Sequence, residues 1–400
     1  MEKAIASNAL LTEFDKAINR ENTFAEKYDL RPQLFGTEDV LPMWVADMDL
    51  PTPAFVLDAL KQRLEHPILG YNKMPNELYQ AIIEWQAQHN YPVKAGQIRF
   101  THNVANGFFM AVQAFTQPDD AVLVMPPIYP PFLSAPEKNG RKTVEVPLLL
   151  IDGVYHIDFT GLENTIIENR AKLLLFCNPQ NPSGRVWLRE ELQQLADICL
   201  RHQVNIVSDE IHSDLTFAPH KHTPLASLSD DIAQITVTLS SPGKSFNLGG
   251  LQLGYAIIAN AKLRQQYTQI CQNNAIYDLN TMALHAMLAA YSEQGKSYLP
   301  SLKEHLQNNI LTFSDFLAQH FPLIKVMQVH AGYLVWLDFS KMFQNHKELK
   351  AWLIDKCRLG LNDGLSFGEA GKGYMRINLA VTSETLNQAM QQMLEAKQTR

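Results

Sequence analysis

The chain has 400 residues, 46% of them hydrophobic, and a formal net charge of −7. This length can bury a large core, either as two domains or as one large α/β unit with a smaller companion. The acidic balance offers no extended cationic face for phosphates, so nucleic acid is excluded as an expected partner. The opening Met1–Ser7 lacks the apolar stretch of a signal peptide, and no run of about 18 apolar residues follows. We expect a cytoplasmic protein that does not bind membranes.

The cysteines and histidines do not form a metal-binding pattern. The cysteines are Cys177, Cys199, Cys271 and Cys357. They lack the short paired spacings of metal and redox motifs, so we expect buried, small apolar side chains. His220 and His222 flank Lys221 without an acidic or thiol ligand nearby in sequence, which favours a solvated loop. The sequence therefore predicts no metal site.

Short apolar runs alternate with helical patterns in the middle of the chain. The runs cover 97–100, 121–125, 172–177, 204–208, 234–239 and 254–258, with an amphipathic helix expected over 189–202. The alternation predicts a largely parallel sheet covered on both faces. Such sheets bind ligands beyond the carboxyl ends of their strands. The residues at or just past the ends of these runs are Asn103, Tyr129, Asn181, Asp209 and Ser241.

The chain from about residue 290 shows a different pattern. Amphipathic helices are predicted over 298–319 and 347–356, a short strand over 333–339, and a last helix from about Glu384. Longer helices around a short strand indicate a second, smaller structural region.

Two charged residues suit one cofactor chemistry. Lys244 lies among small residues in Ser240–Asn247, about 35 residues after Asp209, which ends an apolar strand. A pyridoxal 5′-phosphate (PLP) enzyme needs an amine for a Schiff base and a carboxylate that keeps the pyridine nitrogen protonated. Lys244 and Asp209 fit these catalytic roles. The alternatives are a surface lysine, and a helix cap or ordinary ion pair for the aspartate.

Several motifs in order resemble one known family. Asn178–Gly184 closes another apolar strand, and together with the aspartate and lysine segments it resembles the fold-type I aminotransferase superfamily. Pro42–Asp49, Ser208–His212 and Lys244–Asn247 are similar to the MalY/PatB branch, the cystathionine β-lyase type of carbon–sulfur lyase. The resemblance extends from about Phe14 to the C-terminal helix.

The resemblance implies an α/β fold of the PLP-dependent fold-type I class. A large domain contains a mostly parallel seven-stranded sheet sandwiched by helices, and a smaller α+β domain follows it. The implied boundaries are 1–45 for an N-terminal segment that packs with the small domain, 46–289 for the large PLP-binding domain and 290–400 for the small domain. A homodimer is implied in which Tyr71 reaches the phosphate of the neighbouring site, although a core tyrosine is the alternative.

The resemblance also implies contacts around the cofactor ring. Asn181 donates to the phenolic oxygen, and His212 stands where many relatives have a tyrosine that touches the same oxygen. Tyr129 stacks on the pyridine face. The alternatives are a turn asparagine, a structural histidine and a turn tyrosine.

For the phosphate, the resemblance implies donors at a strand-to-helix turn. Val104 and Ala105 are expected to offer backbone amides at a helix N-terminus, and Ser241 its hydroxyl. Asn103 stands where relatives usually have glycine, and because asparagine tolerates a left-handed backbone better than other residues, we expect the turn to be kept. Gln252 falls about where transaminases have a phosphate-binding arginine.

Substrate contacts are implied for three residues. Arg376 corresponds to the arginine that binds the substrate α-carboxylate through two hydrogen bonds, and an ordinary ion pair is the alternative. Tyr333 and Asn181 are the other expected contacts.

The implied reaction is the α,β-elimination of L-cystathionine or another cysteine S-conjugate to a thiol, pyruvate and ammonia. Lys244 would remove the Cα proton. Two alternatives stay open: a PLP-dependent aminotransferase for aromatic or neutral amino acids, and a protein whose main role is to bind a transcription regulator.

Overall fold

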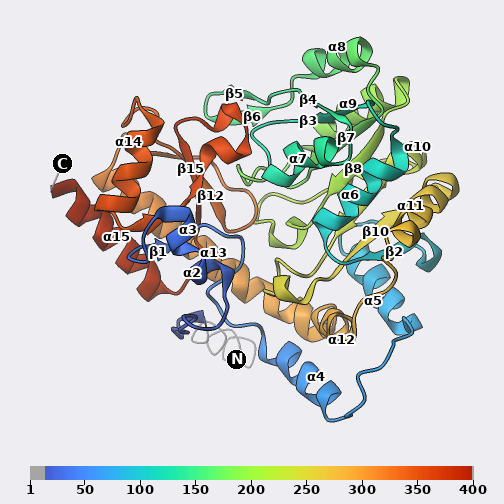
Figure 1. Ribbon diagram of the computed structural model, residues 1–400, viewed down its shortest axis with the longest axis horizontal. Helices are drawn as coiled ribbons and strands as arrows, with labels where there is room; N and C mark the ends of the chain where they lie inside the picture. The colour runs from blue at the N-terminus through green and yellow to red at the C-terminus, as the bar shows by residue number, and fades with distance from the viewer. Residues whose placement is uncertain (1–13, 399–400) are drawn as a thin grey trace. The chain divides into compact units, whose positions relative to one another are not determined.

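The computed structural model describes residues 14–398, which form two compact units (Figure 1). Of the described residues, unit 1 contains 14–51, Pro182–Gly184 and 300–398, and unit 2 contains Thr52–Asn181 and Arg185–Leu299. The boundaries expected from the sequence are at 46 and 290. The Met1–Ser7 segment lies outside the described residues.

Unit 2 is built on a seven-stranded sheet. In order across the sheet, the strands are β2 (Ile98–Thr101), β10 (Gly254–Ile258), β9 (Thr236–Ser240), β8 (Asn205–Asp209), β7 (Leu173–Cys177), β3 (Ala121–Val124) and β4 (Lys142–Glu145). Strand β10 runs antiparallel to both of its neighbours, and all other pairs are parallel. The mostly parallel seven-stranded sheet is confirmed.

The strand register aligns the carboxyl ends along one edge of the sheet. Asp209 of β8 pairs with Cys177 of β7 and Leu239 of β9. Ser240 follows Leu239 and ends β9, and β2 ends at Thr101. Because neighbouring strands lie only about 4.8 Å apart, residues that follow these strands come together at this edge.

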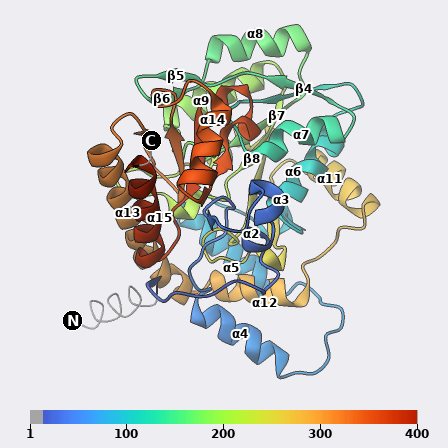
Figure 2. The ribbon, with the colours of Figure 1, turned by 60° about the vertical axis from the view of Figure 1, so that its left-hand side comes forward.

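One face of the sheet is covered by three helices: α6 (Val104–Phe115), α7 (Pro130–Lys138) and α11 (Ala261–Asn273). Their apolar side chains pack with Val207, Val237 and Ala256 of the sheet, all of them buried. Helix α6 lies against β7 and β8, and α7 lies against β3 and β4 (Figure 1 and Figure 2). This burial fixes the register, because a shift of one residue would turn the apolar side chains to the other face.

The opposite face is held partly by polar contacts. Tyr255 alternates with Ala256 on β10, so it points to this second face. Its hydroxyl accepts a hydrogen bond from Gln86 of α5 (Asn76–Ala87) at 2.9 Å and lies 3.0 Å from the Tyr291 hydroxyl, after α12 (Thr281–Ala290). These bonds satisfy polar groups that burial would otherwise leave unpaired.

Unit 2 contains further helices, a β-hairpin and short turns. They are α4 (Ala54–Leu64), α8 (Phe159–Asn169), α9 (Arg189–Arg201), α10 (Asp230–Ile235), the hairpin strands β5 (Leu149–Ile151) and β6 (Val154–His156), and short 3₁₀ turns at Ala95–Gln97, Ser213–Leu215, Leu225–Ser227 and Gly249–Leu251. Helix α9 confirms the predicted amphipathic helix, since Leu192, Leu195 and Cys199 recur at helical spacing and are buried.

Unit 1 contains a four-stranded antiparallel sheet. Its strands, in order, are β11 (Lys325–Val326), β12 (Leu334–Asp338), β15 (Tyr374–Asn378) and β14 (Asn362–Asp363). A separate parallel pair joins β1 (Leu41–Pro42) to β13 (Leu359–Gly360). The helices are α2 (Glu26–Asp29), α3 (Arg31–Phe35), α13 (Glu293–His320) from Pro300 onward, α14 (His346–Ala351) with a π-helical turn at Trp352–Lys356, and α15 (Ser383–Gln398), besides 3₁₀ turns at Gly364–Phe367 and Glu369–Gly371.

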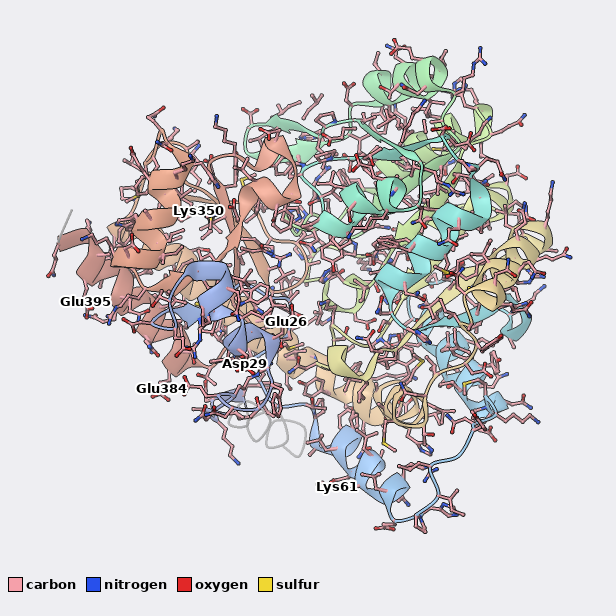
Figure 3. The ribbon with its side chains drawn as sticks, in the orientation of Figure 1. Glu26, Asp29, Lys61, Lys350, Glu384 and Glu395 are labelled. Atoms are coloured by element: carbon pink, nitrogen blue, oxygen red, sulfur yellow. The ribbon has the colours of Figure 1, made fainter. Side chains whose placement is uncertain are left out.

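The surface carries charges of both signs. Figure 3 labels exposed Glu26 and Asp29 on α2, whereas Lys27 between them is fully buried. All four cysteines are buried free thiols, as predicted. Within residues 14–398, no helix combines the length and apolar character needed to cross a bilayer.

Candidate functional site

Asp209 is a buried carboxyl group at the carboxyl end of β8. It follows Val207 by two residues, so it lies on the sheet face that α6 covers. Burial raises the pKa of Asp209 to about 7, although the Ile211 N–H at 3.1 Å and the charge of Lys244 both act to lower it. A carboxylate at this position therefore needs a further positive partner to stay ionised at neutral pH.

Lys244 lies in the turn after β9, close enough to Asp209 for its charge to act on that carboxyl group. Backbone hydrogen bonds from Phe246 to Pro242 at 3.0 Å and from Leu248 to Gly243 at 2.9 Å close this turn. The lysine is half-buried. The structure thus brings together the two residues that the sequence paired.

The N-terminus of α6 forms the expected strand-to-helix turn, but with another backbone geometry. Asn103 is extended, with φ −164°, and its side chain accepts a hydrogen bond from the Asn106 N–H at 2.7 Å. The turn is kept without the left-handed backbone that asparagine would tolerate, because this capping role requires an extended conformation. The N–H groups of Val104 and Ala105 have no acceptor within residues 14–398. The Asn103 side-chain amide donates to Gln252 at 2.5 Å.

Ser241 uses its hydroxyl within the chain. The hydroxyl donates to the Leu253 carbonyl at 2.7 Å and accepts from the Gly243 N–H at 2.9 Å. This pair of bonds ties the start of the lysine turn to the end of the following loop.

Three other expected cofactor residues lie at the same edge of the sheet. Asn181 and His212 are buried, after β7 and β8 respectively. Tyr129 is half-buried at the start of α7, with its ring centre 6.3 Å from that of Phe132. The sheet topology thus places all three beyond carboxyl ends of parallel strands, as Asp209 is.

A second buried aspartate, which the sequence did not single out, contacts the lysine turn. Asp214 accepts hydrogen bonds from Trp85 Nε1 and from the Ser245 hydroxyl, each at 2.9 Å, and His89 Nε2 lies 3.5 Å away. Burial acts to raise the pKa of Asp214, but these contacts hold it below the usual value. No pattern in the sequence links these residues, which come from separate segments of the chain.

His222 corrects the predicted solvated loop. Its Nε2 lies 2.9 Å from Glu210 Oε2, and its side chain is 1% exposed. Glu210 also accepts from the Ser208 hydroxyl at 2.7 Å and from the Leu225 N–H at 3.1 Å. The prediction failed because the acidic partner comes from the end of β8 instead of the local sequence. His220 is partly exposed.

Tyr71 lies in the segment between α4 and α5 and is fully exposed. The alternative of a core tyrosine is therefore excluded. Leu64, Ile68 and Leu69 before it are more than half exposed as well. Contiguous exposed apolar side chains are typical of a surface that contacts a partner.

Arg376 and Tyr333 belong to unit 1, where both are buried. Arg376 lies on β15, donates to the Trp44 carbonyl at 3.0 Å and has its guanidinium carbon 4.9 Å from the Phe367 ring centre. The Tyr333 hydroxyl donates to the Ala46 carbonyl at 3.0 Å. Burial and the nearby charge of Asp47 raise the pKa of this hydroxyl, so it remains a donor.

A family model described as aminotransferase class I and II matches residues 38–393, and the chain belongs to this family. Among individual proteins, cystathionine beta-lyase PatB of Bacillus subtilis (strain 168) is 42% identical over 96% of this chain and 99% of its own length. Protein MalY of Escherichia coli (strain K12) is 30% identical over 96% of this chain and 98% of its own length.

Solved structures give the same result. Cystalysin from Treponema denticola, whose structure contains pyridoxal 5′-phosphate, has a TM-score of 0.93 and 33% identity, covering 96% of this chain and 98% of its own. The PLP-bound C-S lyase from Staphylococcus hominis has a TM-score of 0.89 and 32% identity, covering 96% and 97%. These likenesses confirm the fold-type I class and the branch expected from the sequence.

Proposed function

We propose that the chain is a PLP-dependent carbon–sulfur β-lyase that acts on L-cystathionine or another cysteine S-conjugate and releases a thiol, pyruvate and ammonia. The observation that carries this conclusion is the 42% identity to PatB, which spans nearly all of both chains. The lyase names among the relatives favour elimination over amino transfer.

The residues at the carboxyl edge of the sheet suit PLP. The N–H groups of Val104 and Ala105 are unused donors at the start of a helix, where the helix dipole favours an anionic phosphate. Asp209 is a buried carboxyl group whose raised pKa a cationic pyridinium N–H would bring down. Lys244 supplies a nearby amine. The charges and hydrogen-bonding groups of these residues therefore match those of PLP.

Further contacts follow from the family resemblance. Asn181 and His212 would bind the phenolic oxygen, and Tyr129 would pack on the ring. Ser241 would bind the phosphate if its hydroxyl turns away from the Leu253 carbonyl, to which it now donates.

Bound PLP supplies an aldehyde that captures the substrate amine and a ring that accepts electrons released at Cα. Lys244 would take the Cα proton, and Asp209 would hold a proton on the pyridine nitrogen. Loss of the thiolate from Cβ and uptake of water give pyruvate and ammonia. Arg376 would bind the substrate α-carboxylate, with Tyr333 and Asn181 as further contacts.

We assign unit 2 as the PLP-binding domain and unit 1 as the small domain joined by the N-terminal segment. Proteins of this family bind amino-acid substrates and typically act as dimers. The exposed Tyr71 supports a dimer in which this residue reaches the phosphate of the neighbouring subunit's site. The cytoplasmic location stays a prediction.

Mixed dimers test the role of Tyr71. A dimer of one Tyr71→Ala subunit and one Lys244→Ala subunit keeps one site with both residues intact only if Tyr71 acts across the interface. A mixed dimer should therefore have about half of the wild-type activity per site, and an equimolar mixture that exchanges subunits at random should have about a quarter. A mixture that stays inactive although dimers have exchanged subunits would contradict the assignment.

Incubation with L-cystathionine tests the reaction. Purified protein loaded with PLP should release homocysteine, pyruvate and ammonia in equal amounts without an added keto acid. Turnover that requires a keto acid and releases no thiol would identify an aminotransferase instead.

A role in binding a transcription regulator also remains a proposal. A pull-down should then give the same complex with wild type and Lys244→Ala. No complex with either protein would exclude this role.

A further inference from the structure

Within the motif Pro42–Asp49, side chains form hydrogen bonds with the backbone carbonyl group of each residue in one short segment. Four successive carbonyl groups, those of residues 44–47, each accept a side-chain hydrogen bond. The donors are Arg376 to Trp44 at 3.0 Å, Asn378 to Val45 at 2.7 Å, Tyr333 to Ala46 at 3.0 Å, and Asn378 to Asp47 at 2.6 Å. Arg376 therefore lies at one end of a rigidly bonded segment.

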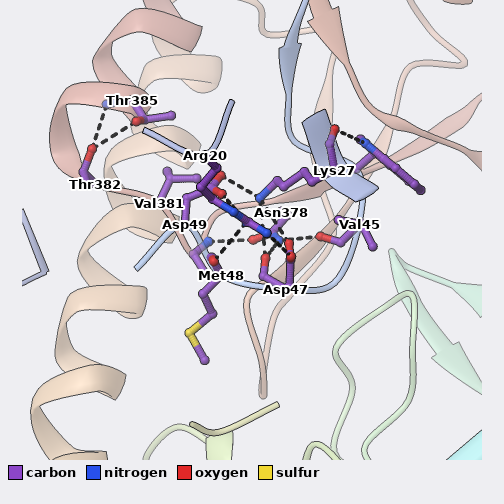
Figure 4. A network of polar contacts seen from close by, with 12 residues as sticks. Arg20, Lys27, Val45, Asp47, Met48, Asp49, Asn378, Val381, Thr382 and Thr385 are labelled. Carbon is purple, nitrogen blue, oxygen red and sulfur yellow. Dashed lines mark hydrogen bonds and ion pairs between the residues drawn. The ribbon is translucent and has the colours of Figure 1, made fainter. Parts of the chain in front are cut away.

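A cluster of two cations and two carboxylates holds the other end of this segment (Figure 4). Arg20 contacts Asp47 and Asp49, each at 2.6 Å. Lys27 forms an ion pair with Asp49 at 2.7 Å and lies 3.8 Å from Asp47. Burial alone would lower the pKa of Arg20, but the two carboxylates raise it above its usual value. The charges balance within the cluster.

Trp44 connects this charge cluster to Arg376. Its indole Nε1 donates to the Lys27 carbonyl at 3.0 Å, while its own carbonyl accepts from Arg376. The Lys27 side chain is fully buried, and that of Asp49 is 7% exposed. A fully buried lysine is rare unless its charge is paired, so its position depends on Asp49.

We propose that the Lys27–Asp49 ion pair, together with Arg20, positions Arg376 for the substrate α-carboxylate by fixing the Trp44–Asp47 backbone. This inference rests on the proposed function, because it takes Arg376 as the carboxylate-binding residue. Lys27, Asp49 and Arg20 are positioning residues. They act through the Trp44 carbonyl, which holds one of the guanidinium nitrogens in place. A guanidinium must be oriented to bind a carboxylate through two parallel hydrogen bonds.

Lys27→Met tests the proposal, since methionine keeps an unbranched apolar chain and removes the charge. We expect the KM for L-cystathionine to rise roughly tenfold or more while kcat changes by less than about threefold, the pattern of weakened ground-state and transition-state binding alike. The matched control is Lys397→Met in the same unit, whose ammonium donates to the His320 carbonyl at 2.6 Å. The control should keep the wild-type KM.

Hydrogen exchange of the PLP-loaded protein gives a readout that does not depend on turnover. The Met43 and Asp49 N–H groups donate to the Gly360 and Ala380 carbonyls at 2.8 and 2.9 Å. In Lys27→Met their exchange should be roughly tenfold faster or more, while the strands of the seven-stranded sheet keep wild-type exchange. Adding Asp49→Asn restores the charge balance and should reverse part of both effects.

Asp47→Asn provides a milder second variant if Lys27→Met does not fold, because the Asp47 side chain is 32% exposed. The same two effects are expected, at roughly threefold size. A folded variant with wild-type KM, or with wild-type exchange at Met43 and Asp49, would overturn the positioning role. If wild type itself releases no thiol from L-cystathionine, the proposed function fails, and the exchange measurement alone decides whether the ion pair fixes the segment.

Discussion

Asp209 and Asp214 are two buried aspartates of the same unit whose pKa values shift in opposite directions. Burial raises the pKa of Asp209 to about 7, and the Ile211 N–H and the charge of Lys244 offset only part of this rise. Burial acts on Asp214 as well, but Trp85 and Ser245 donate to it and His89 lies beside it, so its pKa falls below the usual value.

The difference separates a structural group from a functional one. A buried carboxylate that the chain itself surrounds with donors needs nothing further, and Asp214 therefore supports the fold. A buried carboxylate with too few donors has a shifted pKa, which is typical of positions that bind a ligand or take part in catalysis. The raised pKa of Asp209 is of this second kind, and in the proposed function a pyridinium cation would supply what its surroundings lack.

The largest effect on elimination is expected from the replacement of Lys244, whose charge acts on Asp209. Lys244→Ala removes the amine that we propose binds PLP covalently and takes the Cα proton, so elimination should fall at least roughly 1,000-fold while the fold is kept. Absorbance spectra and thiol release measure the two losses. A variant that keeps the long-wavelength absorbance of covalently bound PLP would contradict the assignment of Lys244.

Asp209→Asn should reduce elimination by roughly 100-fold or more, because the ring nitrogen would then lose the group that we propose keeps it protonated. The same substitution should stabilise the cofactor-free protein at pH 8. Between the unfolded pKa of 3.8 and the folded value of about 7, the folded chain retains a proton that the unfolded chain loses. Stability therefore declines as the pH rises through this window, by on the order of 4 kcal/mol.

Thermal unfolding of the cofactor-free protein at pH 5 and pH 8 measures this second effect. The decline in melting temperature between the two pH values should be smaller in Asp209→Asn than in wild type. Equal declines in both proteins would show that Asp209 is not the group that titrates.

Asp214→Asn should act mainly on stability. The folded pKa of Asp214 lies below the unfolded one, so its contribution is present above the unfolded pKa and is lost as the pH falls through the folded pKa. The loss of its charged hydrogen bonds should cost about 2 kcal/mol at pH 7. Urea unfolding with PLP bound measures this cost. A large loss of activity at unchanged stability would contradict this structural role and indicate that Asp214 has a functional role, as proposed for Asp209.

Ser245→Ala should have the smallest of these effects on stability. It removes one of the donors to Asp214 and leaves Trp85 in place, so we expect a loss of about 1 kcal/mol in stability. Ser301→Ala, another buried serine, is a control for the loss of a hydroxyl. Unfolding curves of both variants give the comparison, and a Ser245→Ala protein as stable as wild type would exclude a structural bond to Asp214.

The sequence predicted much of the sheet because buried parallel strands are continuous apolar runs. The run 254–258 coincides with β10, and the other expected runs match their strands within about two residues. The direction of β10 was not predictable, since hydrophobicity does not distinguish parallel from antiparallel pairing. Strand β4 was missed because Lys142–Glu145 is an edge strand with charged ends and partial exposure.

The candidate site was predicted where a motif carries the chemistry, and missed where only the fold brings residues together. Asp209 and Lys244 belong to quoted motifs, and the structure places them close to each other. The contacts of Asp214 with Trp85 and of Glu210 with His222 join separate segments of the chain, and no local sequence pattern predicts them. The sequence indicated that the turn at Asn103 could be kept without glycine, but not that the Asn103 side chain caps α6 with an extended backbone.

The protonation state of the PLP ring nitrogen tests the central claim most directly. We suggest ¹⁵N NMR of the protein loaded with PLP labelled at this nitrogen, at pH 8, for wild type, Asp209→Asn and Asp214→Asn. The nitrogen should be protonated in wild type and Asp214→Asn and deprotonated in Asp209→Asn. An unprotonated nitrogen in wild type, or a protonated one in Asp209→Asn, would contradict the role assigned to this carboxylate.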